Sequence, residues 1–458
     1  MHHEGKYSDH LRSLFRLGAP LVAGQVAHMS IGVTDSVMLG WHSVEALASG
    51  VLGHTFFFVL FIVGAGFGAA VMPVVASALA QNDPVQARRV TRMGLWLSSG
   101  YAIAVLPLFW WSEPVLLAMG QSPELSSLAS GYLRTTGFAI FPALILGVLK
   151  SYLSAQELMR FFLLTMIGGF LLNIPLNYIL IFGNFGFPEL GVQGAAIASL
   201  CVNSFMALCA WVYTAYKLPK QALFARLWRP DWNELVKVMR IGVPIAVTSL
   251  AEAGLFSTSS IMMGWLGTVP LAAHGIVLSI TSLTFVFHLG LSGAATIQAG
   301  QAFGKGDFVA MGQGALSACL ASLGFVIVTV VLFLTLPEAL VSLFVDPNSA
   351  NYPQILAYGV VLLAISALFS AVDAAQVMAL GLLRGLQDTS VPMAMAVFSY
   401  WIIGIPVGYW LCFVMDWGGV GLWAGLAIGL ACAAFTLITR FILLMKRMRF
   451  AANKMRSA

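Results

Sequence analysis

Three acidic side chains lie deep within long apolar stretches of the sequence: Asp35, Glu252 and Asp373. A carboxylate at the centre of a bilayer costs at least ~2.5 to 3.5 kcal/mol on insertion scales, so acids retained there usually bind ions or substrates. We expect no Lys or Arg at the same depth, which leaves a proton, a metal cation or a cationic substrate as the partner. A neutral carboxyl that is hydrogen-bonded to a neighbouring helix is the structural alternative.

Three other residues could support these acids. Asn173 and Asn177 are four residues apart, on one face of a helix, and offer neutral oxygens that suit a hard cation. A hydrogen bond between helices is the other common use of such a pair. Phe256 follows Glu252 by one helical turn and would present its ring face to a cation there, although packing alone is the commoner role of such a residue.

The composition requires a membrane. Of 458 residues, 59% are hydrophobic and 9% are charged, against roughly 25% charged in an ordinary soluble domain. Because about 20 apolar residues cross a bilayer core, the apolar runs predict twelve transmembrane helices in an all-α fold. Their expected ranges are 14–40, 46–80, 93–118, 124–152, 161–183, 191–216, 235–265, 270–302, 313–344, 353–386, 390–414 and 418–446.

Lysine and arginine set the orientation. If the N-terminus is cytoplasmic, every Lys and Arg except Arg134 falls in a tail or connection on that side. This asymmetry predicts cytoplasmic termini and an even number of helices. We therefore expect a multi-pass protein of a bacterial inner membrane. The net charge of +5 is spread over short loops with no single basic face, which argues against a nucleic-acid partner.

The chain contains an internal repeat. A shift of 224 pairs residues 17–20 with residues 241–244, and further along the shift drifts to 231. We therefore predict an N-terminal six-helix lobe at residues 1–217 and a C-terminal one at residues 234–458, joined by a cytoplasmic loop at residues 218–233. An even number of helices in each lobe gives a pseudo-twofold axis along the membrane normal, and such pairs enclose a central cavity.

The repeat does not extend to the acids. Asp35 belongs to the first lobe, whereas Glu252 and Asp373 belong to the second, so two chemically different sites are expected. No nucleophile with a base, no metal cluster and no ATP-binding motif assembles by spacing. The protein is therefore not expected to be an enzyme or to carry a cofactor.

Several segments resemble the multidrug and toxic compound extrusion (MATE) transporter family. Asp35 stands in Val33-Thr34-Asp35-Ser36-Val37-Met38, and the next helix contains Met72-Pro73-Val74-Val75-Ala76. Glu252, Asp373 and the segment Leu383-Arg384-Gly385-Leu386-Gln387-Asp388 are similar to the NorM-type branch. The resemblance covers residues 12–446.

The resemblance implies an antiporter that exports lipophilic or cationic drugs by alternating access, in exchange for inward sodium ions or protons. The residues that it implicates are Asp35, Asn173 and Asn177 in a first-lobe cation site, Glu252 and Asp373 in a second-lobe site, and Pro20 as the bending point of the first helix. A closed chain of two lobes needs no second copy to form the pathway, so a monomer in the lipid bilayer is expected.

One departure bears on the coupling ion. Some NorM-type members have Tyr one turn before the second-lobe aspartate, where this chain has Phe369. The missing hydroxyl removes one ligand from a sodium site at Glu252 and Asp373. Sodium and protons therefore both remain candidates.

A lipid-linked oligosaccharide flippase of the same superfamily is the alternative function. Such a protein handles an anionic pyrophosphate and should line its cavity with Arg or Lys. The charges expected at cavity depth here are acidic, and Arg134 is the one basic residue off the cytoplasmic side. This pattern favours the exporter.

Overall fold

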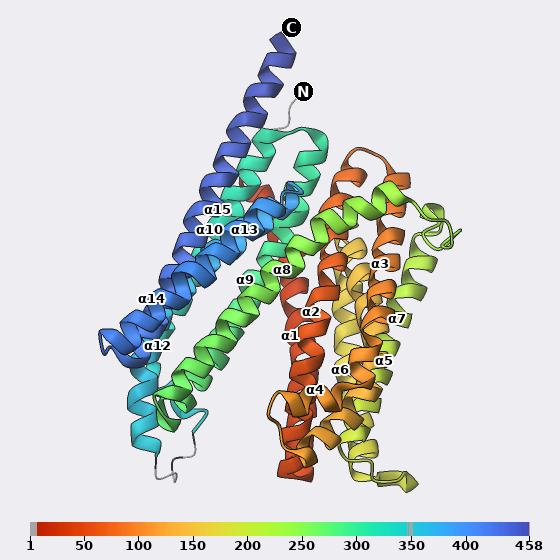
Figure 1. The fold of residues 1–458 in the computed structure, drawn as a ribbon. Coiled ribbons are helices and arrows are strands. Elements are labelled where there is room, and N and C mark those ends of the chain that lie inside the picture. The colour runs from red at the N-terminus through yellow and green to blue at the C-terminus, as the bar shows by residue number, and fades with distance from the viewer. Residues whose placement is uncertain (1–6, 346, 348–350, 458) are drawn as a thin grey trace. The chain divides into compact units, whose positions relative to one another are not determined.

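The computed structural model describes residues 7–345, 347 and 351–457, and these residues form helices and connections with no β-strand (Figure 1). The all-α prediction is confirmed. The helices are α1 (Tyr7–His42), α2 (Val44–Ala80), α3 (Pro84–Trp110), α4 (Ser112–Ala118), α5 (Pro123–Ala155), α6 (Met159–Phe182), η1 (Asn184–Gly186), α7 (Val192–Lys217), η2 (Pro219–Gln221), α8 (Trp232–Trp265), α9 (Thr268–Lys305), α10 (Phe308–Thr335), α11 (Pro337–Ser342), α12 (Tyr352–Gly385), α13 (Ser390–Phe398), η3 (Ser399–Gly404), α14 (Ile405–Tyr409), η4 (Trp410–Val414) and α15 (Gly418–Ser457).

Eleven helical segments of the described chain are long and apolar enough to cross a membrane, and residues 390–414 count as one of them. Helix α1 is not among the eleven, although its 36 residues exceed the length that a crossing needs. Its first turns carry Arg12 and Arg16, and Asp35 lies near its other end. Each of the twelve predicted ranges nevertheless coincides with one or more helices.

Two predicted helices are interrupted. The expected helix at residues 93–118 divides into α3 and α4 at Trp111, and the one at residues 313–344 divides into α10 and α11 at Leu336. The two breaks are 225 residues apart, close to the offset of the internal repeat. The repeat therefore extends to local breaks that hydropathy alone does not reveal.

The helices group into two compact units. We call residues 23–246 the N-terminal unit, and residues 1–22 together with 247–458 the C-terminal unit. Helices α1 and α8 each contribute one part to either unit. The two units are defined by how the helices pack. They do not test the lobe boundaries at residues 217 and 234, which stay a prediction.

In the N-terminal unit, α5 packs against α2, α3 and α7 (Figure 1). Small residues allow α2 and α5 to approach closely, because a Cβ added at Gly68 would lie 3.2 Å from the backbone carbonyl carbon of Gly147. Phe109, Tyr132 and Leu144 belong to the buried hydrophobic cluster of this unit. Such close contact of small residues is typical of helix packing in membranes.

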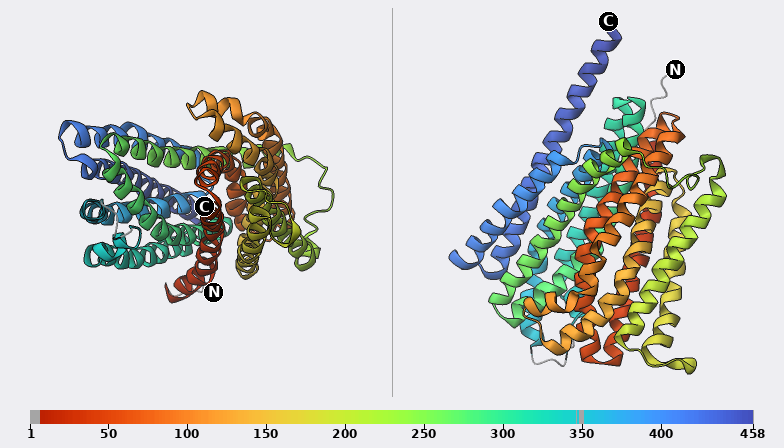
Figure 2. Two further views of the ribbon diagram at one scale, coloured as in Figure 1. Left: turned by 90° about the horizontal axis from the view of Figure 1, so that it is seen from below. Right: turned by 45° about the vertical axis from the view of Figure 1, so that its right-hand side comes forward.

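In the C-terminal unit, α12 packs against α9, α10 and α15. Two hydroxyl groups of α9 bind backbone carbonyls of α12: Ser292 Oγ donates to Val377 O at 2.8 Å, and Thr296 Oγ1 donates to Gly381 O at 2.8 Å. The start of α1 and the end of α15 lie at the same end of this unit, where α15 extends past its neighbours (Figures 1 and 2). The hydroxyl bonds hold α12, which carries Asp373, at a fixed register against α9.

The segment before α15 departs from α-helical geometry. Residues 399–404 and 410–414 form π-helices on either side of Pro406. Glycines of α14 and α15 meet there, because a Cβ added at Gly425 would lie 2.2 Å from Gly408 Cα. A π-turn inserts about one extra residue and often marks a functional position.

We predict that Gly425→Ala destabilises the protein by about 3 kcal/mol, because the new methyl group meets backbone that cannot move aside. Thermal unfolding of the purified protein in detergent measures the effect. Gly324→Ala in α10 is the matched control, since nothing lies within 4 Å of its added Cβ, and it should leave the melting temperature unchanged or slightly higher. Equal behaviour of the two variants would contradict the proposed contact.

Candidate functional site

The N-terminal unit brings Asp35 of α1 together with the two asparagines of α6. Asn173 Nδ2 donates to Asp35 Oδ1 at 2.8 Å, and Asn177 Nδ2 donates to the same oxygen at 2.5 Å. Asn177 Nδ2 also lies 3.2 Å from Asn173 Oδ1. Both asparagines are fully buried, whereas Asp35 is half-buried. The four-residue spacing thus places both amides against one carboxylate oxygen.

Ser199 of α7 completes this group, and the sequence interpretation did not identify it. Its Oγ donates to Asp35 Oδ2 at 2.9 Å. Asp35 therefore accepts three hydrogen bonds, and none of the three donors is charged. Asn177 Oδ1 is buried with no hydrogen-bond partner among the described residues. A free amide oxygen beside a carboxylate suits a small hard cation. We call these four residues the Asp35 site.

The C-terminal unit brings Glu252 of α8 into electrostatic contact with Asp373 of α12. Glu252 Oε1 and Asp373 Oδ1 are both buried without a hydrogen-bond partner in the described chain. Two neighbouring acids in such surroundings repel each other when both are charged, so one of them is favoured to hold a proton or share a cation. The structure thus places the two acids, which the sequence assigned to separate helices, within electrostatic range of each other.

Two neutral side chains border this acidic pair. Gln376 lies one turn from Asp373 beside Glu252, and Tyr400 from η3 faces both acids. The amide of Gln376 and the hydroxyl of Tyr400 are buried and make no hydrogen bond of good geometry within the described residues. We call Glu252, Asp373, Gln376 and Tyr400 the Glu252–Asp373 site. It holds more unsatisfied polar atoms than a structural cluster normally retains.

One basic residue of the same unit interacts with Glu252. No Lys or Arg was expected at the depth of the acids to pair with them, and Arg384, at the end of the expected helix 353–386, was counted with the cytoplasmic connection that follows. Arg384 is the penultimate residue of α12, which ends at Gly385, and it interacts electrostatically with Glu252. The two are not within ion-pair distance. Arg384 therefore provides a long-range positive field rather than a direct partner.

Aromatic side chains extend from this site. Phe256 packs edge-to-face on Phe369 with ring centroids 6.0 Å apart, and Phe369 meets Trp423 in the same way at 5.2 Å. Trp423 Nε1 donates to His274 Nδ1 at 3.1 Å. Phe369 is thus part of a buried aromatic row. The interaction of Phe256 with a cation stays a prediction.

Two further predictions concern ions and bending. No group of three or more His, Cys, Asp or Glu side chains in the described ranges is arranged to hold a metal ion. A sodium ion at Glu252 and Asp373 would therefore also need neutral ligands, which Gln376 and Tyr400 can supply. Pro20 lies inside α1, two residues before this helix passes from one unit to the other.

The family assignment follows from three comparisons. A profile of the MatE family matches residues 20–179 and 244–410. The two matches begin 224 residues apart and end 231 residues apart, the same offsets as the internal repeat. Each match therefore corresponds to one copy of the repeat.

Among curated proteins, the chain is 41% identical over 445 residues to "Probable multidrug resistance protein NorM" of Agrobacterium fabrum, covering 97% of this chain and 96% of that protein. It is 37% identical over 449 residues to the protein of the same name from Pseudomonas putida, covering 96% and 95%. A crystal structure of "MATE in the bent conformation" matches with a TM-score of 0.87 at 20% identity, over 98% of this chain and 99% of that one, and supports the fold. The chain therefore belongs to the MATE family, in its NorM-type branch.

Proposed function

We propose that this protein exports lipophilic and cationic small molecules in exchange for inward-moving sodium ions or protons, by alternating access. The observation that carries the proposal is the presence of two separate carboxylate sites, one in each unit, in a chain with eleven described segments fit to span a membrane. The curated relatives are named as probable multidrug resistance proteins. We place the protein in the bacterial inner membrane as a monomer with cytoplasmic termini.

In the proposed mechanism, drug and coupling ion compete for the carboxylates. An ion that enters from outside neutralises the acids and releases a bound cationic drug outward. Moving one charge across the membrane is worth about 2.3 kcal/mol per 100 mV, so a one-for-one exchange of monovalent cations gains nothing from the potential. Export of a singly charged drug against its gradient with the help of the potential requires at least two coupling charges. The Asp35 site and the Glu252–Asp373 site could hold one each.

The direct test is ethidium transport by the purified protein in liposomes. A sodium gradient without a pH gradient, and a pH gradient without sodium, are imposed in separate runs. Transport under one gradient supports the proposal and identifies the ion. If no cationic dye is transported under either gradient, the proposal is contradicted. The flippase, whose substrate is a lipid-linked oligosaccharide, would then be the favoured function.

We predict that Tyr400→Phe raises the ion concentration needed for half-maximal efflux about tenfold, since loss of one ion–hydroxyl contact costs ~1.4 kcal/mol or more. Stability should fall by no more than about 1 kcal/mol, because the hydroxyl lies beside the amide of Gln376 but makes no hydrogen bond of good geometry within the described residues. Tyr409→Phe in α14 is the control, because Tyr409 is 48% exposed. An equal shift in both variants would remove Tyr400 from the site.

A further inference from the structure

The connection between α7 and α8 is fastened to one face of α3. Arg92 donates to Leu223 O at 2.7 Å and to Ala222 O at 2.9 Å, and Trp96 Nε1 donates to Leu227 O at 2.7 Å. Four-residue spacing places these side chains in one row along α3. The connection, which the sequence presented as a polar linker, is thereby folded back over the first turns of α3.

This folding builds a basic pocket of about 400 Å³ that lies wholly within the N-terminal unit. Its walls come from the start of α3, the connection and the start of α8. The polar and charged side chains lining it are Arg88, Arg89, Arg92, Arg226, Arg229, Asp231 and Asn233. Five guanidinium groups therefore surround one carboxylate. Their positive charges repel one another, and a bound anion would reduce that repulsion.

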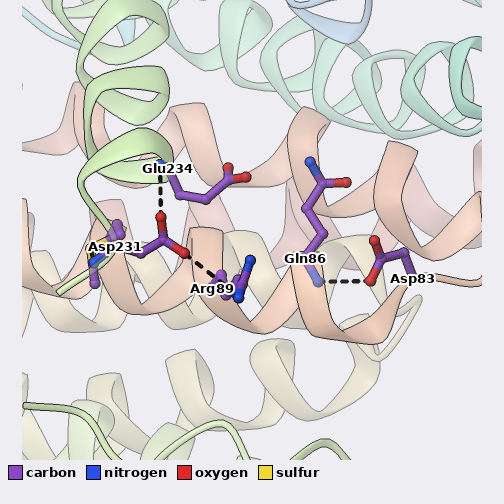
Figure 3. Close-up of polar contacts among 6 residues, drawn as sticks. Asp83, Gln86, Arg89, Asp231 and Glu234 are labelled. Carbon is purple, nitrogen blue, oxygen red and sulfur yellow. Dashed lines mark hydrogen bonds and ion pairs between the residues drawn. The ribbon is translucent and has the colours of Figure 1, made fainter. Parts of the chain in front are cut away.

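Figure 3 shows the partners of Asp231, the carboxylate that lines the pocket. Asp231 Oδ2 lies 3.4 Å from Arg89 Nε, and Asp231 Oδ1 accepts a hydrogen bond from the backbone N–H of Glu234 at 3.4 Å, so Asp231 also caps α8. Asp83 is directed to the N–H of Gln86 at the start of α3. Asp231 thus pairs with Arg89 alone, and the other four arginines of the pocket form no ion pair within the described residues.

Three arginines retain unused donors. Arg88 Nη1 reaches Gln221 O at 3.5 Å, but its Nε is buried with no hydrogen-bond partner in the described chain. Arg226 and Arg229 are exposed and form no ion pair within the described ranges. A buried guanidinium N–H without a partner is costly and indicates that an acceptor belongs there.

The position of the pocket relative to the bilayer indicates the class of ligand. Helix α3 has 27 residues, which is about 40 Å at ~1.5 Å per residue, close to the thickness of a bilayer with its headgroups. A membrane-spanning α3 would therefore place its first two turns, which carry Arg88 and Arg89, in the headgroup layer. Trp228 and Trp232 beside the pocket are 76% and 66% exposed, as expected of indoles at a membrane interface.

We propose that this basic pocket binds the phosphate headgroup of an anionic phospholipid. The guanidinium forks of Arg226 and Arg229 close on the phosphate oxygens from the connection, and Arg88 Nε donates from α3. Arginine suits this role because its planar donors match phosphate geometry. The proposal does not depend on which compounds the protein transports.

The test uses the full-length protein in detergent, with binding followed by thermal shift and by native mass spectrometry. The probes are a diphosphate phospholipid (cardiolipin), phosphatidylglycerol, zwitterionic phosphatidylcholine and inorganic pyrophosphate. We expect the two anionic lipids to raise the melting temperature and the other two probes to have no effect. In the double variant Arg226→Gln/Arg229→Gln, half-saturation should need about 30-fold more cardiolipin, since each basic residue near a membrane surface is worth about 1 kcal/mol.

The matched control is Lys217→Gln/Lys220→Gln, which removes the same charge at the start of the same connection without altering the pocket lining. It should bind cardiolipin like the unmodified protein. Equal weakening in both double variants would overturn the proposal in favour of diffuse attraction. Stabilisation by pyrophosphate that the arginine variant abolishes would replace the lipid with a soluble anion. A variant that unfolds early without lipid is compared by mass spectrometry alone, where unchanged lipid retention would equally overturn the proposal.

Discussion

Asp35→Asn is expected to lower gradient-driven efflux tenfold or more while leaving the protein folded. Asparagine matches aspartate in shape, and its carbonyl oxygen can accept from Asn173 and Asn177 while its amide meets Ser199. Packing is therefore preserved, but the carboxylate no longer binds a cation or proton. A ligand that does not distinguish two conformations cannot shift their populations, so the gradient loses its influence. Dye transport in liposomes under the effective gradient measures the loss.

Two variants of α7 provide a partial-loss comparison and a control for the effect of Asp35→Asn. Ser199→Ala removes one hydrogen bond to Asp35 and keeps the carboxylate, so a loss of about two- to fivefold is expected, in proportion to ~0.5 to 1 kcal/mol. Asn203→Ala is the control, because Asn203 donates to Ser199 O and does not contact Asp35. Wild-type coupling in Asp35→Asn would show that the Asp35 site has a structural role only.

The second large effect is expected at the Glu252–Asp373 site, where Asp373→Asn should abolish coupled efflux and raise the thermal stability of the ligand-free protein. The aspartate is 5% exposed, one of its oxygens has no partner, and it lies in the field of Glu252. Replacement of one acid relieves the repulsion and the cost of burial, together worth about 1 kcal/mol or more. Glu252→Gln should behave in the same way. Thermal unfolding and dye transport are measured on the same preparations.

Asp388→Asn is the control for Asp373→Asn and Glu252→Gln, because it also removes one negative charge from the same unit. Asp388 lies in the same unit, but it pairs with Arg440 at 2.6 Å. Its replacement should lower stability by no more than about 1 kcal/mol and should leave efflux intact. If Asp373→Asn instead destabilises the protein and keeps its coupling, the acid is structural and the second coupling charge must be sought elsewhere.

The sequence was informative where residue type and helical spacing act together. Asn173 and Asn177 could be assigned to one face because α6 remains helical across both positions, with Pro175 between them. The pairing with Asp35 spans 138 residues, and spacing alone does not determine contacts between distant helices. Ser199 was missed because one serine in a helix rich in small residues has no distinctive pattern.

The other misses have local causes. Tyr400 lies in a π-helix, so faces extrapolated at 3.6 residues per turn fail there. The interaction of Arg384 with Glu252 was not foreseen, because the positive-inside rule counts a basic residue at a helix end with the adjoining connection. The breaks at Trp111 and Leu336 fall inside apolar runs, where hydropathy continues across a change in backbone direction.

The passage of α1 and α8 between the two units has a mechanical consequence. Each helix changes unit at equivalent points, between residues 22 and 23 and between residues 246 and 247. Pro20 and Pro244 precede these points, and each removes a backbone donor where its helix would bend. A helix bends most easily where a backbone hydrogen bond is missing, so α1 and α8 share a point of low bending resistance at the place where each leaves one unit for the other.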